Sequence, residues 1–213
     1  MGLVASGATK ETAHDDLIKI KVLLRRYQLA KAVKVELKKT VKLALLDEEK
    51  NSEGNLILSN GRLKLEILKP EPSTVIVNKN LIWVISPTSK DLGGKTQVMK
   101  ISSSSLKKQA KAPLAILIGR PSAWDQFKVE SKTEDENTAK YVLKPKDPKE
   151  MNEMVVLKIT VDKKNVELRD LSYSDDLDNE TRFDFKAADF KVDIKDDAFD
   201  YVPPKNAELT EYK

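Results

Sequence analysis

The fold of this chain is decided by residues 53–87, which read EGNLILSNGRLKLEILKPEPSTVIVNKNLIWVISP. Extended segments follow one another here, and they keep an apolar residue at every second position, which is the period of a strand with one buried face. The apolar positions are Leu56, Leu58, Leu63, Leu65, Ile67, Val75, Val77, Leu81, Trp83 and Ile85. Turn residues separate the segments at Asn60-Gly61, at residues 69–72 and at residues 78–80. The stretch therefore predicts an antiparallel meander.

A helix and a long strand are predicted before the meander. Residues 11–29 carry apolar side chains at steps of three and four, which is typical of a helix with one buried stripe. The stripe consists of Leu17, Ile20, Leu24 and Tyr27, with Leu23 beside it. The period then changes to two, and Val33, Val35 and Leu37 point to one side of a strand or strand pair that runs to a polar turn at residues 47–52. Both elements need a large apolar surface to pack on.

The second half of the chain predicts a helical insertion followed by more strands. Residues 106–110 and 113–118 predict two short helices, and residues 127–185 alternate again as strands. The second short helix has an apolar face that contains Leu114, Leu117 and Ile118. We expect a flexible N-terminus at residues 1–10 and a single domain at residues 11–213, because this length is common for one all-β domain.

The composition excludes several classes of function. The 38 Lys and Arg residues against 34 Asp and Glu residues give a net charge of only +4, and the two signs are interleaved, which indicates a solvated surface and not a nucleic-acid-binding one. Cysteine is absent, which removes thiolate catalysis and zinc-finger sites, and His14 is the one histidine. Gly94-Lys95 lacks the preceding glycine of a phosphate-binding loop. We expect no catalytic residue, no metal and no cofactor, and a lipid-modifying enzyme stays an alternative.

The order of several short motifs resembles the family of LolA, the periplasmic carrier of outer-membrane lipoproteins. Within the meander, the resemblance is carried by Glu53-Gly54, Pro70, Val75-Ile76-Val77, Leu81-Ile82-Trp83 and Pro87. Later blocks at residues 112–118, 124–127, 181–185 and 199–204 match in the same order. The resemblance implies a mainly β fold, an incomplete, half-open antiparallel β-barrel with a short α-helical lid.

The same resemblance implies a lipid-binding cavity at the mouth of the barrel, covered by the first helix and the lid. The residues expected to line it are Val33, Val35, Leu37, Leu63, Leu65, Ile67 and Trp83, and the lid residues are Leu114, Leu117 and Ile118. Trp83 either lines the cavity or packs beneath it. The family holds its lid with an arginine near the turn before the second strand of the meander; here Arg62 lies beside that point and is the candidate latch.

The function implied is noncovalent carriage of lipoprotein acyl chains across the periplasm. The expected partners are the lipoproteins, the inner-membrane lipoprotein-releasing ABC transporter and an outer-membrane acceptor, and the carrier is expected to be a monomer. We take the signal peptide to have been removed. Two proteins of the same fold stay as alternatives: the LolB-like outer-membrane acceptor, and an envelope-stress sensor domain that binds lipid or lipoprotein.

Overall fold

The structure is a computed structural model, and it describes residues 10–88, 94–102, 124–147 and 154–212. The helix and strands are α1 (Lys10–Leu29), β1 (Val33–Leu43), β2 (Glu48–Ser59), β3 (Arg62–Lys69), β4 (Ser73–Asn78), β5 (Leu81–Pro87), β6 (Thr96–Ser102), β7 (Phe127–Glu134), β8 (Thr138–Pro145), β9 (Val156–Asp162), β10 (Glu167–Ser174), β11 (Glu180–Phe185) and β12 (Glu208–Tyr212). Two 3-10 turns are η1 (Ala44–Leu46) and η4 (Asp196–Phe199). The predicted helices at residues 106–110 and 113–118 lie outside the described residues, as do residues 1–9 of the predicted flexible N-terminus.

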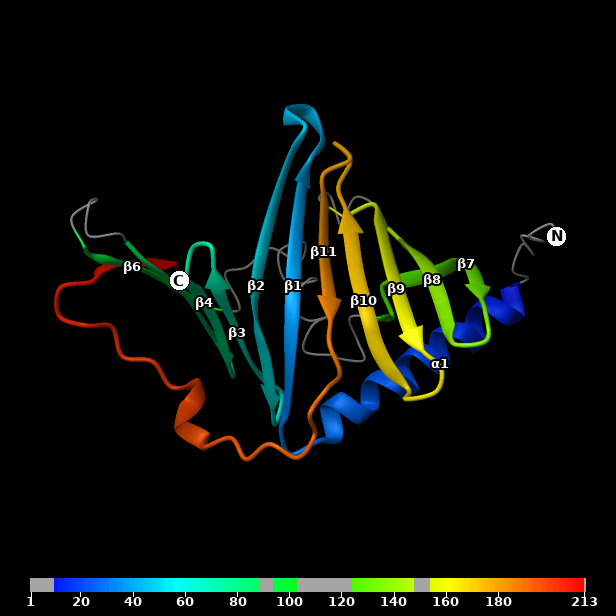
Figure 1. Cartoon of the computed structure of the whole chain (residues 1–213), viewed down its shortest axis with the longest axis horizontal. Coiled ribbons are helices and arrows are strands. Elements are labelled where there is room, and N and C mark those ends of the chain that lie inside the picture. The colour runs from blue at the N-terminus through cyan, green and yellow to red at the C-terminus, as the bar shows by residue number, and fades with distance from the viewer. Residues whose placement is uncertain (1–9, 89–93, 103–123, 148–153, 213) are drawn as a thin grey trace.

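One twelve-stranded sheet contains all of these strands, in the spatial order β12-β6-β5-β4-β3-β2-β1-β11-β10-β9-β8-β7. Neighbouring strands are antiparallel except for β12 and β6, which run parallel. The two ends of the sheet, β12 and β7, do not pair with each other, so the sheet curves without closing (Figure 1). The predicted fold class, a mainly β, half-open barrel, is confirmed.

The predicted meander forms β2 to β5, and two-residue turns set the register of two of its three hairpins. The turn at Asn60-Gly61 pairs Ser59 with Arg62. Both turn residues have positive φ, 50° and 72°, which is the backbone that a tight hairpin turn requires and that Asn-Gly adopts most readily. Between β4 and β5, a second two-residue turn follows Asn78 and has Lys79 at φ 52°.

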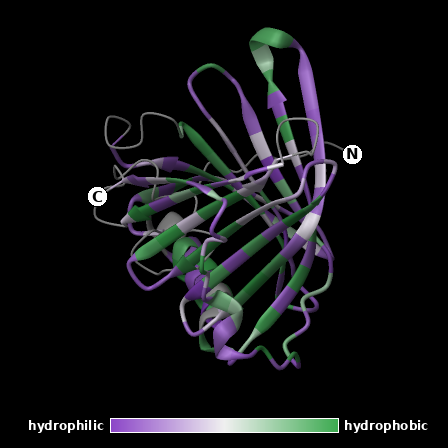
Figure 2. Ribbon diagram, turned by 90° about the vertical axis from the view of Figure 1, so that its left-hand side faces the viewer, coloured by the Kyte–Doolittle hydropathy of each residue, from purple (hydrophilic) through white to green (hydrophobic). Residues whose placement is uncertain are grey.

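The hairpin of β1 and β2 is longer than its neighbours and projects beyond them (Figure 1). Its turn lies at residues 44–47, so the predicted turn at residues 47–52 is wrong: most of those polar residues belong to β2. Asp47 closes the turn in the left-handed region, where its N–H donates to the carbonyl of Ala44 at 3.3 Å. The tip is apolar (Figure 2), and its Leu45 and Leu46 side chains are 80% and 64% exposed.

The predicted helix is confirmed as α1, and it packs against one face of the sheet. Its buried apolar side chains are Leu17, Ile20, Leu23 and Tyr27. The side chain of Leu24, also predicted for the stripe, is outside the described part. In Figure 1, α1 runs past the lower ends of β7 to β10. Among the helices that the structure describes, none is both long and apolar enough to span a membrane.

After β11 the chain runs below the lower ends of β1 and β2 (Figure 1), and Phe199 packs on Ile57, Ile76 and Ile85 on the opposite face of the sheet before β12 joins β6 at the edge. This C-terminal segment, residues 186–207, begins with a bridge between Lys34 and Asp189 and contains η4. The sheet therefore has an inner face, packed against α1, and an outer face, crossed by the C-terminal segment.

Candidate functional site

Six of the seven predicted cavity residues lie together on the inner face. They are Val33, Val35 and Leu37 of β1 and Leu63, Leu65 and Ile67 of β3, and all six are buried. They share one apolar cluster with Leu56 and Leu58 of β2 and with the apolar stripe of α1. Cross-strand pairing places Val33 opposite Leu58 and Leu58 opposite Leu63, so adjacent strands present apolar side chains side by side.

In this structure the inner face is covered. Val33 and Leu63 are 0% exposed, and Trp124 and Phe127 fill the cluster where the chain enters β7, with their ring centroids 6.4 Å apart. Ile20 of α1 belongs to the same cluster. The predicted lid residues Leu114, Leu117 and Ile118 lie outside the described residues. Any ligand that contacts Val33 or Leu63 must first displace part of this cover.

Trp83 lies on the outer face, so grouping it with the other six predicted residues needs correction. It pairs with Ile76 and packs edge-on against Tyr201 of the C-terminal segment, at 5.4 Å between ring centroids. The reason is the two-residue turn before β5, which pairs odd-numbered with even-numbered residues and so exchanges the faces. Ile82 and Val84 take the inner positions instead. Turn length was the signal in the sequence that could have found this.

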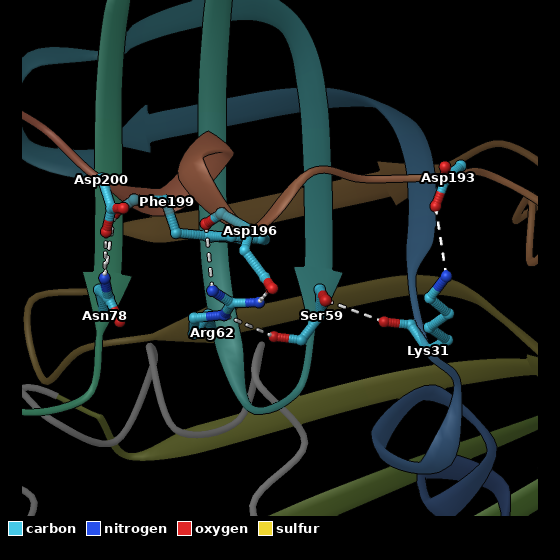
Figure 3. Close-up of polar contacts among 8 residues, drawn as sticks. All are labelled: Lys31, Ser59, Arg62, Asn78, Asp193, Asp196, Phe199 and Asp200. Carbon is cyan, nitrogen blue, oxygen red and sulfur yellow. Dashed lines mark hydrogen bonds and ion pairs between the residues drawn. The ribbon is translucent and has the colours of Figure 1, made fainter.

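Arg62 also lies on the outer face, where it binds the C-terminal segment (Figure 3). Its guanidinium donates to the carboxylate of Asp196 at 2.7 Å and to the carbonyl of the same residue at 3.2 Å. It also donates to the Ser59 carbonyl at 3.4 Å and lies 4.5 Å from the centroid of the Phe199 ring. The predicted contact between Arg62 and the lid involves residues that are not described, so it stays a prediction.

Further contacts hold the C-terminal segment on the outer face. Phe199 is fully buried in a small apolar cluster with Ile57, Ile76 and Ile85. The amide of Asn78 donates to the Phe199 carbonyl at 3.3 Å and to the Asp200 carboxylate at 3.1 Å (Figure 3). These contacts hold the C-terminal segment in place, and they lie on the other side of the sheet from the predicted lipid site.

Polar groups of α1 fix its position on the sheet. Asp16 is buried, and its carboxylate lies 3.6 Å from the Lys132 ammonium of β7. The Tyr27 hydroxyl accepts a hydrogen bond from the Leu168 N–H at 3.1 Å. Burial raises the pKa of Tyr27 to about 12, because the phenolate would lose its hydration. The ion pair of Asp16 thus holds the N-terminal half of α1 on the sheet, and the hydrogen bond of Tyr27 holds the C-terminal half.

The described residues hold no group of three His, Cys, Asp or Glu side chains that could bind a metal. What they form is an open antiparallel half-barrel whose apolar inner face packs on one long helix. The family model described as outer membrane lipoprotein carrier protein LolA matches residues 28–202, so the chain belongs to this family. The resemblance seen in the sequence is confirmed.

Solved structures that resemble this one have very different sequences. An uncharacterized conserved protein from Thermus thermophilus is 10% identical at a TM-score of 0.57, over 92% of this chain and 99% of that one. A DUF1329 family protein from Desulfovibrio piger is 12% identical at a TM-score of 0.50, over 89% and 98%. A LolA superfamily protein from Nitrosomonas europaea is 12% identical at a TM-score of 0.45, over 91% and 99%. No curated protein matches the chain.

Proposed function

We propose that this protein binds the acyl chains of lipoproteins noncovalently on the inner face of its sheet and carries them across the periplasm. The observation that carries the proposal is the contiguous aliphatic surface of β1, β2 and β3 on one side of a sheet that does not close. Membership of a family named for lipoprotein carriage supports it. The expected partners are an inner-membrane exporter, which loads the carrier, and an outer-membrane acceptor.

The energetics of such a carrier require an apolar surface that can be uncovered and covered again. An acyl chain gains about 0.8 kcal/mol for each CH₂ that leaves water, so a carrier must offer an apolar surface in place of the membrane. It must also release the chain, so the free energy gained by binding cannot greatly exceed the cost of displacing the cover. A mobile cover of aliphatic side chains meets both requirements without any catalytic group.

The experiment that tests the proposal is release of a labelled lipoprotein from spheroplasts by the purified protein. We expect a soluble complex that forms only when the exporter is active. Leu65→Glu places a charge on the inner face and should abolish release, whereas Leu68→Glu on the same strand alters an exposed side chain and should not. Val84→Gln, at a less buried inner position, repeats the test if Leu65→Glu unfolds.

The proposal fails if the wild-type protein releases no lipoprotein. Binding of a free hydrophobic probe without release of lipoprotein would instead favour the two alternatives of the same fold, the acceptor and the sensor. Equal release by the Leu65→Glu and Leu68→Glu variants, both folded, would show that the inner face is not the binding face.

A further inference from the structure

Lys39 is a cationic side chain at an inner-face position of β1. It follows Leu37 in the alternation that places the odd-numbered residues of the strand against α1. Its Cα partners are Ser52 in β2 and Phe183 in β11, and Phe183 belongs to the inner apolar cluster. The next inner position along the strand is Val41. Lys39 is therefore a charged residue at a position where the alternation of the strand predicts an apolar one.

Two lysines of this hairpin, Lys42 and Lys50, have a carboxylate partner, but the more buried Lys39 has none among the described residues. Lys42 lies 3.5 Å from a Glu49 oxygen, and Lys50 lies 3.7 Å from a Glu48 oxygen. Lys39 is partly buried, and this burial lowers the pKa of its ammonium group because no described carboxylate offsets the lost hydration. An uncompensated cation next to an apolar core is costly. The cost is removed when an anion binds.

We propose that the Lys39 ammonium binds the anionic head group of a lipid whose acyl chain lies along the inner face. This inference rests on the acyl-chain binding of the proposed function, and it adds a second class of ligand, single-chain lipids with a carboxylate or phosphate head group. An ammonium offers three donors, and its hydrogen bonds to anionic oxygens are about twice as strong as neutral ones. A low-dielectric neighbourhood strengthens the attraction further.

The length of the inner face suits this arrangement. Lys39 lies six positions after Val33 in β1, and at roughly 3.3 Å per position this distance is about 20 Å. An acyl chain in one leaflet spans about half of the roughly 30 Å hydrocarbon core, about 15 Å. A single chain can therefore lie over Leu37, Val35 and Val33 with its head at Lys39. The thioether-linked diacylglyceryl group of a lipoprotein has no charge at this point, so the site distinguishes anionic lipids from it.

The alternative is a purely structural role, in which the Lys39 stem covers apolar surface while its ammonium group reaches water, as long cationic side chains commonly do. The two interpretations differ in whether the positive charge matters to ligand choice. Lys39→Met keeps the length and apolar character of the stem and removes the charge, whereas Lys39→Arg keeps the charge. Lys38→Met is the matched control, because Lys38 is exposed on the outer face, opposite Glu53.

The experiment measures displacement of an uncharged pyrene-labelled ester by pairs of competitors with the same chain: palmitate against hexadecanol, and palmitoyl-lysophosphatidylglycerol against monopalmitoylglycerol. We expect the wild-type protein, Lys39→Arg and Lys38→Met to prefer the anionic member of at least one pair by about tenfold. Lys39→Met should bind both members of that pair equally. The pair that shows the preference identifies the head group as carboxylate or phosphate.

Two results would overturn the inference while leaving the proposed function standing. One is equal binding of charged and uncharged competitors by the wild-type protein, and the other is an undiminished preference in Lys39→Met. If none of the four competitors displaces the probe and the probe itself does not bind, the inner face is not an acyl-binding surface, and both proposals fail.

Discussion

At the scale of single residues, Gly54 lies where the backbone of β3 leaves no room for a side chain on β2. A Cβ built on Gly54 would lie 2.0 Å from the carbonyl oxygen of Glu66, which is backbone and cannot rotate away. We expect Gly54→Ala to force the strands apart and lower the free energy of unfolding by about 3 kcal/mol, the upper part of the range for overpacking. Urea denaturation followed by circular dichroism measures this.

Gly61→Ala is the control for that substitution. Nothing lies within 4 Å of a Cβ at this turn position, but its φ of 72° is unfavourable for alanine. We expect a loss of about 1 kcal/mol from backbone strain alone. Equal losses for the two variants would mean that the close approach at Gly54 does not limit the packing of β2 against β3.

Tyr27 makes stability depend on pH in the alkaline range. Its pKa is raised from 10 to about 12, chiefly by burial, so between these values the folded protein keeps a proton that the unfolded chain has lost. The stabilisation is complete below pH 10 and is lost as the pH rises through 12, up to about 3 kcal/mol in total. We expect wild-type protein to lose about 1 kcal/mol more than Tyr27→Phe between about pH 9 and pH 11 in urea denaturation. Parallel pH profiles for the two proteins would refute this.

Arg62 is expected to hold the C-terminal segment and not the binding face. Arg62→Leu removes the bond to Asp196 and the contact with the Phe199 ring, which together contribute about 1 kcal/mol. We expect faster hydrogen exchange in residues 195–201 and unchanged affinity for a hydrophobic probe. Arg182→Leu, which removes an ion pair with Asp184, is the control. Lost affinity with unchanged exchange would instead support the lid latch implied by the family resemblance.

At the scale of elements, the docking of α1 depends on one stripe of side chains. Ile20 is 1% exposed against the sheet, while Val22 on the same helix is 63% exposed. We expect Ile20→Ala to cost about 2–4 kcal/mol through lost burial and a cavity, and Val22→Ala to change the free energy of unfolding by less than about 0.5 kcal/mol. Similar effects in chemical denaturation would mean that α1 is not docked by this stripe.

Local sequence patterns were sufficient to predict most elements but not every face. Alternation and turn chemistry predicted the meander, and spacing predicted α1, because both signals act over a few neighbouring residues. The face of Trp83 was missed because the turn was predicted at residues 78–80, whereas Asn78 pairs with Leu81 and the turn has only two residues. Lys39 was missed because interleaved charges were interpreted only as a solvated surface.

At the scale of the whole molecule, the two faces of the sheet are covered mainly by different parts of the chain. The inner face packs against α1 and against Ala188 and Phe190 at the start of the C-terminal segment, and the outer face is crossed by the rest of that segment. No local pattern in residues 186–204 predicts this crossing, because its contacts join residues far apart in the chain, such as Arg62 and Asp196. The family resemblance predicted the open barrel, but the contacts between the C-terminal segment and the outer face could be seen only in the structure.

If the inner face binds acyl chains, its cover must move, and α1 is one described part of that cover. Val33 and Leu63 have no exposed surface, so they can contact a ligand only after neighbouring groups are displaced. Asp16 and Lys132 lie 3.6 Å apart and join α1 to β7, away from the C-terminal end of the helix, which leads into β1. A covalent link at this pair would hold α1 down.

The natural sequence has no cysteine, so a pair introduced by Asp16→Cys and Lys132→Cys will be the only site of reaction with a short bis-maleimide. We expect linkage to reduce probe affinity at least about tenfold, because uncovering the face then costs about 1.4 kcal/mol or more. The unlinked double variant should bind the probe as the wild type does. Arg62→Cys with Asp196→Cys, linked across the outer face, should bind as the wild type does. Full affinity of the α1-linked protein would mean that the acyl chain enters without displacing this helix, so that the part of the cover that moves is another segment of the chain.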